Sequence, residues 1–150
     1  MEDNNNYNEV NDDYEIKDAP WHNRRGQNDF TPDFDPNDIE KNKIIAGLSY
    51  LGILFFLPLL ACPDSKFGRF HANQSFVLFM ISLISWIIFG VIKVIFGMIP
   101  LFGLLISIFI VLIQFAVSIV LFALYIIGAV NAFTGKAKEL PLIGTIKIIK

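Results

Sequence analysis

The fold of this protein is decided by one stretch of its sequence, SFVLFMISLISWIIFGVIKVIFGMIPLFGLLISIFIVLIQFAVSIVLFALYIIGAVNAF (Ser75–Phe133). These 59 residues carry a single charge, that of Lys93. About 20 apolar residues in a helix cross the hydrocarbon core of a bilayer, so the stretch is too long for one span and fits two. Two glycines bracket a proline in Gly97–Gly103, which is typical of a break between helices. We therefore expect membrane helices at about 75–96 and 104–131.

A third apolar run precedes this pair. Ile44–Cys62 has nineteen residues without a charge, enough for another span. Pro36 suits the first position of a helix, and we expect Pro58 to kink that helix near its end. The sequence thus predicts a first membrane helix over 36–62, followed by a polar loop at Pro63–Gln74. The fold class is an all-α integral membrane protein with about three transmembrane helices.

The segments on either side differ in charge. Residues 1–35 carry ten acidic and three basic side chains and are rich in asparagine, a composition that predicts a disordered acidic tail. The helical membrane domain is 36–150, where nine basic side chains outnumber four acidic ones. Two phenylalanines near the end of the tail, in Asp29–Pro32 and Asp33–Pro36, indicate a linker against the membrane interface or a docking motif for a partner. The lysines and aliphatic residues of 134–150 predict an interfacial segment.

Polar side chains follow one line along the predicted third helix, at spacings of seven, four and seven residues. On the second helix Ser82 and Lys93 share a face, and we expect the Lys93 side chain to extend to the membrane interface. Polar groups in lipid are costly, so both faces must meet protein or water. They are either contacts between helices or the lining of a path for a polar solute. This candidate intramembrane stripe consists of Ser82, Lys93, Ser107, Gln114, Ser118 and Tyr125.

Catalytic and metal chemistry find little support in the sequence. Cys62 is the single cysteine, and His22 and His71 are far apart, whereas a zinc site normally takes three or four ligands. No nucleophile–base or acid–base pair is evident, so we expect no enzyme activity, no metal and no cofactor. The basic residues flank apolar runs instead of gathering on one surface, which argues against a nucleic-acid partner.

Three further pieces of sequence carry a resemblance to a known family. They are KIIAGLSYLG (Lys43–Gly52), DSKFGRFHANQ (Asp64–Gln74), and NAFTGK with ELPLIG (Asn131–Lys136 and Glu139–Gly144). With them the chain resembles a family of small uncharacterised bacterial membrane proteins, grouped with the chloroplast inner-envelope import component of the Tic twenty-kilodalton type. The resemblance implies a helical protein of a bacterial cytoplasmic membrane. The plant relatives are associated with protein import and have four membrane helices, where three are counted here.

Two functional hypotheses follow. The first is a non-enzymatic multi-pass membrane protein that acts through protein–protein contacts, in assembly or translocation of other membrane proteins. Its partners would be the lipid bilayer and a second protein or further copies of itself. The alternative is a small oligomeric channel or carrier lined by the intramembrane stripe. With three spans, the positive-inside rule puts the loop and the C-terminus in the cytoplasm and the acidic tail outside. The candidate interaction loop consists of Lys66, Arg69, Phe70, His71, Asn73 and Gln74.

Overall fold

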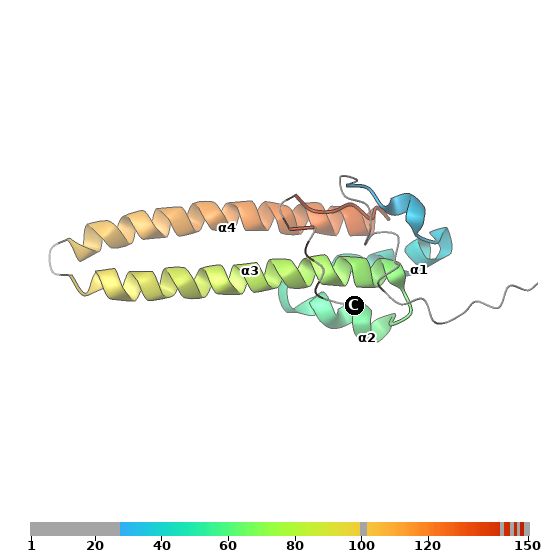
Figure 1. Ribbon diagram of the computed structural model, residues 1–150, viewed down its shortest axis with the longest axis horizontal. Helices are drawn as coiled ribbons and strands as arrows, with labels where there is room; N and C mark the ends of the chain where they lie inside the picture. The colour runs from blue at the N-terminus through green and yellow to red at the C-terminus, as the bar shows by residue number, and fades with distance from the viewer. Residues whose placement is uncertain (1–27, 100–101, 142, 145, 147, 149–150) are drawn as a thin grey trace, which may run out of the picture.

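The protein is built on a pair of long antiparallel helices. A computed structural model describes residues 28–99, 102–141, 143, 144, 146 and 148. Helices α3 (Lys66–Gly97) and α4 (Gly103–Phe133) run side by side along the molecule (Figure 1). Their 32 and 31 residues correspond to about 48 and 46 Å, and both are long and apolar enough to cross a membrane. The prediction of an all-helical integral membrane protein is confirmed.

The turn between the two helices lies where the sequence predicted it. Gly103 starts α4, and its backbone N–H donates to the carbonyl of Ile99 at 2.9 Å. A Cβ at this position would lie 2.8 Å from the carbonyl oxygen of Phe96. Only glycine therefore allows the end of α3 and the start of α4 to approach so closely at the turn.

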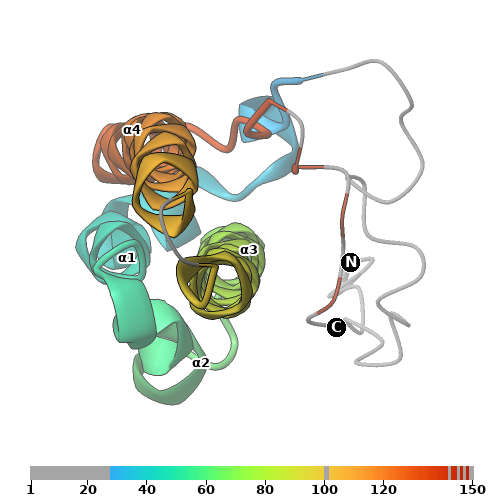
Figure 2. The same ribbon diagram turned by 90° about the vertical axis from the view of Figure 1, so that its left-hand side faces the viewer.

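The predicted first membrane helix, 36–62, is wrong. The chain forms α1 (Pro36–Leu48), a turn, the 3₁₀-helix η4 (Gly52–Phe56) and the short helix α2 (Leu57–Ala61). Gly52 has a φ of 62°, a left-handed conformation that reverses the chain and that side chains with a Cβ disfavour. As a result α1 and α2 lie beside the same end of α3 (Figures 1 and 2). Two described helices, not three, have the length of a span.

The predicted polar loop at 63–74 is also wrong, because α3 already begins at Lys66. Two side chains cap its first turn. The Ser65 hydroxyl accepts a hydrogen bond from the backbone N–H of Gly68 at 2.8 Å. A carboxylate oxygen of Asp38, on α1, accepts one from the N–H of Phe67 at 3.0 Å. These caps satisfy free N–H groups at the helix start.

The end of the predicted disordered tail is folded, whereas residues 1–27 lie outside the described residues. The 3₁₀-helix η3 (Thr31–Asp33) is flanked by Phe30 and Phe34, which are 1% and 5% exposed. Both rings pack on Phe70 of α3, with centroids 6.2 and 5.6 Å away. The interpretation of these phenylalanines as an interfacial linker is therefore wrong, because they belong to the core.

The segment after α4 returns along the same end of the molecule. Its described residues pack on α3 and on the N-terminal segment, and its place at the membrane interface stays a prediction. The Phe30 N–H donates to the carbonyl of Ala137 at 2.9 Å. Asp29 and Lys138 form an isolated antiparallel bridge, and their charged groups are 3.4 Å apart.

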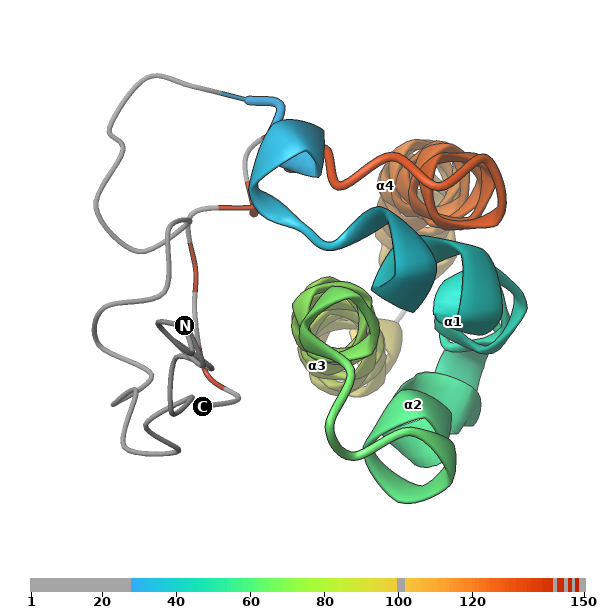
Figure 3. The same cartoon turned by 90° about the vertical axis from the view of Figure 1, so that its right-hand side faces the viewer.

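All of these contacts gather at one end of the helix pair (Figure 1), the end that faces the viewer in Figure 3. We call this end the polar cap, which comprises the described residues of 28–50, 65–78 and 128–148. The opposite end is the turn between α3 and α4, and we call the rest of that pair the membrane hairpin. Because the hairpin has two spans, the N-terminal and C-terminal segments lie at the same end. The three-span prediction had put them on opposite sides of the membrane.

Candidate functional site

The predicted intramembrane stripe lies mainly between α3 and α4. The ammonium of Lys93 donates a hydrogen bond to the side-chain oxygen of Gln114 at 2.8 Å. Closer to the polar cap, Ser82 of α3 lies beside Tyr125 of α4, and the Ser82 hydroxyl donates to the carbonyl of Leu78, on its own helix, at 2.8 Å. Near the turn, the Ser107 hydroxyl oxygen lies 3.9 Å from the place of a Cβ on Gly97. At three positions along the hairpin, a stripe residue of α4 thus lies against α3.

Ser118 departs from this pattern. Its side chain is exposed, and its hydroxyl donates to the carbonyl of Gln114, on its own helix, at 2.8 Å. Such a bond satisfies a hydroxyl in lipid without any partner helix. Ser118 therefore needs neither water nor protein beside it.

The Lys93 side chain extends along the hairpin to Gln114 of the facing helix. Side chains of a helix lean toward its N-terminus, which for Lys93 means away from the turn. Its partner Gln114 is eleven residues into α4, or about 16 Å from the start of that helix. The Lys93 ammonium is bound between α3 and α4, and the expectation that Lys93 reaches the membrane interface stays a prediction.

The surroundings of Lys93 are apolar. Between Leu83 and Ile99 the large side chains on the surface of α3 are hydrophobic, including Val94 at 63% exposure. An ammonium group has three N–H donors, and among the described residues one acceptor, the amide of Gln114, is within hydrogen-bonding distance. The pair supplies a hydrogen bond but no negative charge.

The residues predicted to form an interaction loop have a different position. Phe70, His71, Asn73 and Gln74 are at most 3% exposed, so they are part of the core of the polar cap. Lys66 is exposed and Arg69 is half-buried, with its Nε donating to the carbonyl of Pro63 at 2.8 Å. Because four of the six residues are buried, little of the predicted interaction loop is accessible to a partner.

Two neighbouring amides hold the C-terminal segment. Asn73 donates to the carbonyl of Ile146 and accepts from the N–H of Ile148, each at 2.7 Å. Gln74 donates to the carbonyl of Lys138 at 3.2 Å and accepts from the N–H of Leu140 at 3.1 Å. Each amide thus binds extended backbone at two points, as a neighbouring strand would.

His71 joins the three helical parts of the cap. Its Nδ1 is hydrogen-bonded to the hydroxyl of Tyr50 at 3.1 Å, and its ring lies against that of Phe67, with centroids 4.7 Å apart. The Tyr50 ring in turn covers Gly128 of α4, where a Cβ would be 2.6 Å from the ring carbon bearing the hydroxyl. The buried imidazole is therefore a packing element.

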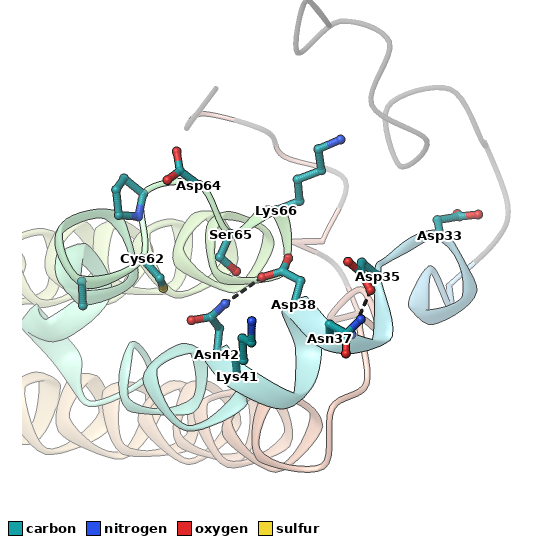
Figure 4. Close-up of a pocket in the computed structure, with 12 residues that line it drawn as sticks. Asp33, Asp35, Asn37, Asp38, Lys41, Asn42, Cys62, Asp64, Ser65 and Lys66 are labelled. Carbon is teal, nitrogen blue, oxygen red and sulfur yellow. Dashed lines mark hydrogen bonds between the residues drawn. The ribbon is translucent and has the colours of Figure 1, made fainter. Parts of the chain in front are cut away.

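A cavity of about 710 Å³ opens between α1 and the start of α3 (Figure 4). Its carboxylates include Asp38, whose second oxygen accepts from the amide of Asn42 at 2.7 Å. Burial and the negative charge of Asp38 raise the pKa of the Cys62 thiol, against a hydrogen bond with Ser65 that lowers it, so the thiol is a weak nucleophile. Within the described residues, no group of three or more side chains is placed to hold a metal ion.

Similarity to known proteins is confined to a short part of the chain. Over 45 residues it is 49% identical to the magnetosome protein MamF of Paramagnetospirillum magneticum, a match that takes in 30% of this chain and 40% of MamF. The chain is similar there to a magnetosome protein. MamF of Magnetospirillum gryphiswaldense is 47% identical over 45 residues, which are 30% of this chain and 40% of that protein. The magnetosome protein MmsF of P. magneticum is 40% identical over 45 residues, 30% of this chain and 42% of MmsF.

The chain thus spans about two fifths of the length of the curated relatives it matches. No family model matches it, and no solved structure matches it. Together, the two apolar helices and the similarity to bacterial proteins identify a bacterial membrane protein.

Proposed function

We propose that this protein is non-enzymatic and acts by binding another membrane protein inside the bilayer, with Lys93 as the centre of the contact. The observation that carries the proposal is the position of this lysine, hydrogen-bonded to Gln114 between two apolar helices. A lysine in a membrane helix is costly, by up to about 2.5–3.5 kcal/mol at the helix centre on insertion scales, and Lys93 lies four residues before the end of α3. Such residues usually pair with an opposite charge, and the pair marks a functional contact.

The required charge comes from outside this chain. No aspartate or glutamate occurs between Asp64 and Glu139, which includes both long helices. A second copy would therefore bring another lysine and no carboxylate to the same depth. We infer a different membrane protein, with an aspartate or glutamate in a membrane helix that packs against α3 and α4 near Lys93.

The orientation of the protein follows from its basic residues. In the described chain Lys41, Lys43, Lys66, Arg69, Lys136 and Lys138 all belong to the polar-cap end. The sequence of the turn, Gly97–Gly103, has no charge. By the positive-inside rule the polar cap faces the cytoplasm, with both of its terminal segments on that side.

The biological role that we assign is assembly or translocation of membrane proteins. The resemblance to the family of the chloroplast import component supports this role, and the similarity to magnetosome proteins of two bacteria is compatible with a non-enzymatic membrane protein. A contact protein also fits a hairpin that leaves most of its apolar surface uncovered.

The channel hypothesis has weaker support. A solute path needs polar groups that remain open to it, whereas Lys93 donates to Gln114 and the Ser82 hydroxyl to the carbonyl of Leu78. Passage of ions or small solutes through purified protein in liposomes, lost in Gln114→Leu, would restore this hypothesis.

The proposal is tested by photocrosslinking in cells. A photoreactive residue at Phe96, one turn from Lys93 and 38% exposed, should capture a membrane protein whose crosslinked helix contains an acidic residue. The adduct should disappear in Lys93→Leu and remain in Ser118→Ala, a matched change on the exposed side of α4. Charge exchange, Lys93→Asp with lysine in place of the partner's acid, should restore it. Unchanged adducts in Lys93→Leu, or adducts with copies of this chain alone, would contradict the proposal.

A further inference from the structure

The two ends of the membrane part differ in width. At the turn, only α3 and α4 are present among the described residues, whereas at the polar-cap end α1, η4 and α2 pack beside them (Figures 1 and 2). The question is whether these extra helical segments lie in water or in lipid. Their side chains and their length decide it.

The α1–α2 unit, residues 44–62, has an apolar outer surface. Ile44, Leu51 and Ile53 are 61–63% exposed, and Leu60 is 73% exposed. These side chains continue the apolar surface of the membrane hairpin. Lipid chains are the occupant that this continuity indicates, because the unit leaves and re-enters the polar cap along the hairpin itself.

The length of the unit places it in one leaflet. The charged residues at its two ends are Lys43, on α1, and Asp64, two residues before the start of α3. α1 and the start of α3 lie at the same end of the molecule. The twenty uncharged residues between Lys43 and Asp64 enter and return, so at about 1.5 Å per residue they reach at most about 15 Å. This depth is about half of the hydrocarbon core. The unit can therefore occupy the leaflet next to the cap and not the other.

The protein therefore takes up more area in one leaflet than in the other. A helix with side chains is about 10–12 Å wide, which corresponds to a cross-section of roughly 80–110 Å² for each of the two added helical segments. We propose that this asymmetry makes the protein a wedge that binds preferentially to bilayers curved convexly toward the polar cap. The ligand is the curved lipid bilayer itself. The inference uses the α1–α2 unit alone and does not depend on a partner at Lys93.

The test uses the full chain in both orientations. Fluorescent protein is reconstituted into giant vesicles of phosphatidylethanolamine and phosphatidylglycerol, and narrow tubes are pulled from them. Protein with the cap outside should be enriched in the tubes about twofold or more, by analogy with other curvature-sensitive insertions. Protein with the cap in the lumen should be depleted. Orientation is measured by protease access to the cap. Equal densities in tube and vesicle for both orientations would overturn the proposal.

A variant then assigns the effect to the unit. The combination Ile44→Ser, Leu51→Ser, Ile53→Ser and Leu60→Ser should remove the enrichment. The matched control changes four similarly exposed residues of the hairpin, Ile84, Val91, Val94 and Ile108, to alanine, and should retain it. Brominated lipids that quench a fluorophore at position 53 give an independent readout in the unmodified background. Quenching by shallow bromines is expected, and no quenching at any depth, as when a second copy covers the unit, would contradict the wedge.

Discussion

The polar cap and the membrane hairpin are built from the same two helices but are stabilised in different ways. In the first turns of α3, His71, Asn73 and Gln74 are almost fully buried and each has a specific partner. Further along, the same helix exposes Trp86 at 68% and Val94 at 63%. The buried polar groups of the cap find their partners within the protein, whereas the apolar surface of the hairpin depends on lipid or on other proteins to cover it. Substitutions should therefore act strongly in the cap and weakly in the hairpin.

The largest effect is expected from Phe34→Ala. This ring packs edge-to-face on Phe67 with centroids 5.9 Å apart, and truncating a buried phenylalanine costs about 3–5 kcal/mol. The N-terminal segment should detach, which limited proteolysis between residues 28 and 35 would detect. Phe109→Ala, at a ring that is 67% exposed on α4, should leave the cleavage pattern unchanged. Equal sensitivity of both variants would contradict the comparison.

Gly128→Ala should be the next in size. A Cβ there would meet the Tyr50 ring, and overpacking of this kind costs about 1–3 kcal/mol. Its control is Gly90→Ala, because a Cβ at Gly90 has nothing within 4 Å. Thermal unfolding in detergent should separate the two variants, with a lower Tm for Gly128→Ala alone. A similar loss for Gly90→Ala would show that the hairpin is as tightly packed as the cap.

A smaller effect is expected from Asn73→Leu. It removes the amide that binds the Ile146 carbonyl and the Ile148 N–H. Each of these two backbone groups then lacks a hydrogen-bond partner, which costs about 1–3 kcal/mol of stability if the group stays buried. Because the C-terminal segment can turn to water, we expect release of this segment and not unfolding of the cap. Faster hydrogen exchange at the Ile148 amide would report it. Protection equal to that of the unmodified protein would show that Asn73 does not hold the C-terminal segment.

The smallest effect concerns pH. Hydrogen bonds from the side chain and backbone of Thr31, and the nearby Lys138, lower the pKa of Asp29. The folded carboxyl therefore binds its proton more weakly than the unfolded one, whose pKa is about 3.9. The stabilisation is present above that pH and is lost as the pH falls through the folded pKa. Asp29→Asn should flatten the decline in stability below about pH 4, measured by denaturant unfolding. An unchanged pH profile would contradict the assignment.

Sequence reasoning predicted the hairpin better than the cap, for a physical reason. Apolar length and the glycines around Gly97–Gly103 are local signals, and they gave the two spans and their turn. Registry along a helix is also local, which is why Gln114 and Tyr125 were predicted to share one line on the same helix. That Lys93 faces this line within the same chain was left open, because it depends on how each helix is rotated about its axis.

The cap depends on contacts between distant parts of the chain. Polar residues such as Asn73 and Gln74 indicate a loop when their partners are unknown, yet here they are buried because backbone from the C-terminal segment satisfies them. The start of α3 is fixed partly by Asp38 on α1. The paired phenylalanines four residues apart, Phe30 and Phe34, were the available signal of a packed segment within a polar tail.

The uncharged turn between α3 and α4 has a consequence for the biogenesis of the protein. Its sequence, GMIPLFG (Gly97–Gly103), contains no ionisable or amide side chain. A loop of this kind can pass through the hydrocarbon core without the desolvation of a charge. Both helices can then enter the bilayer together from the side where they are synthesised, as one hairpin. Lys93, already bonded to the amide of Gln114, is the one charge that has to be carried in with them.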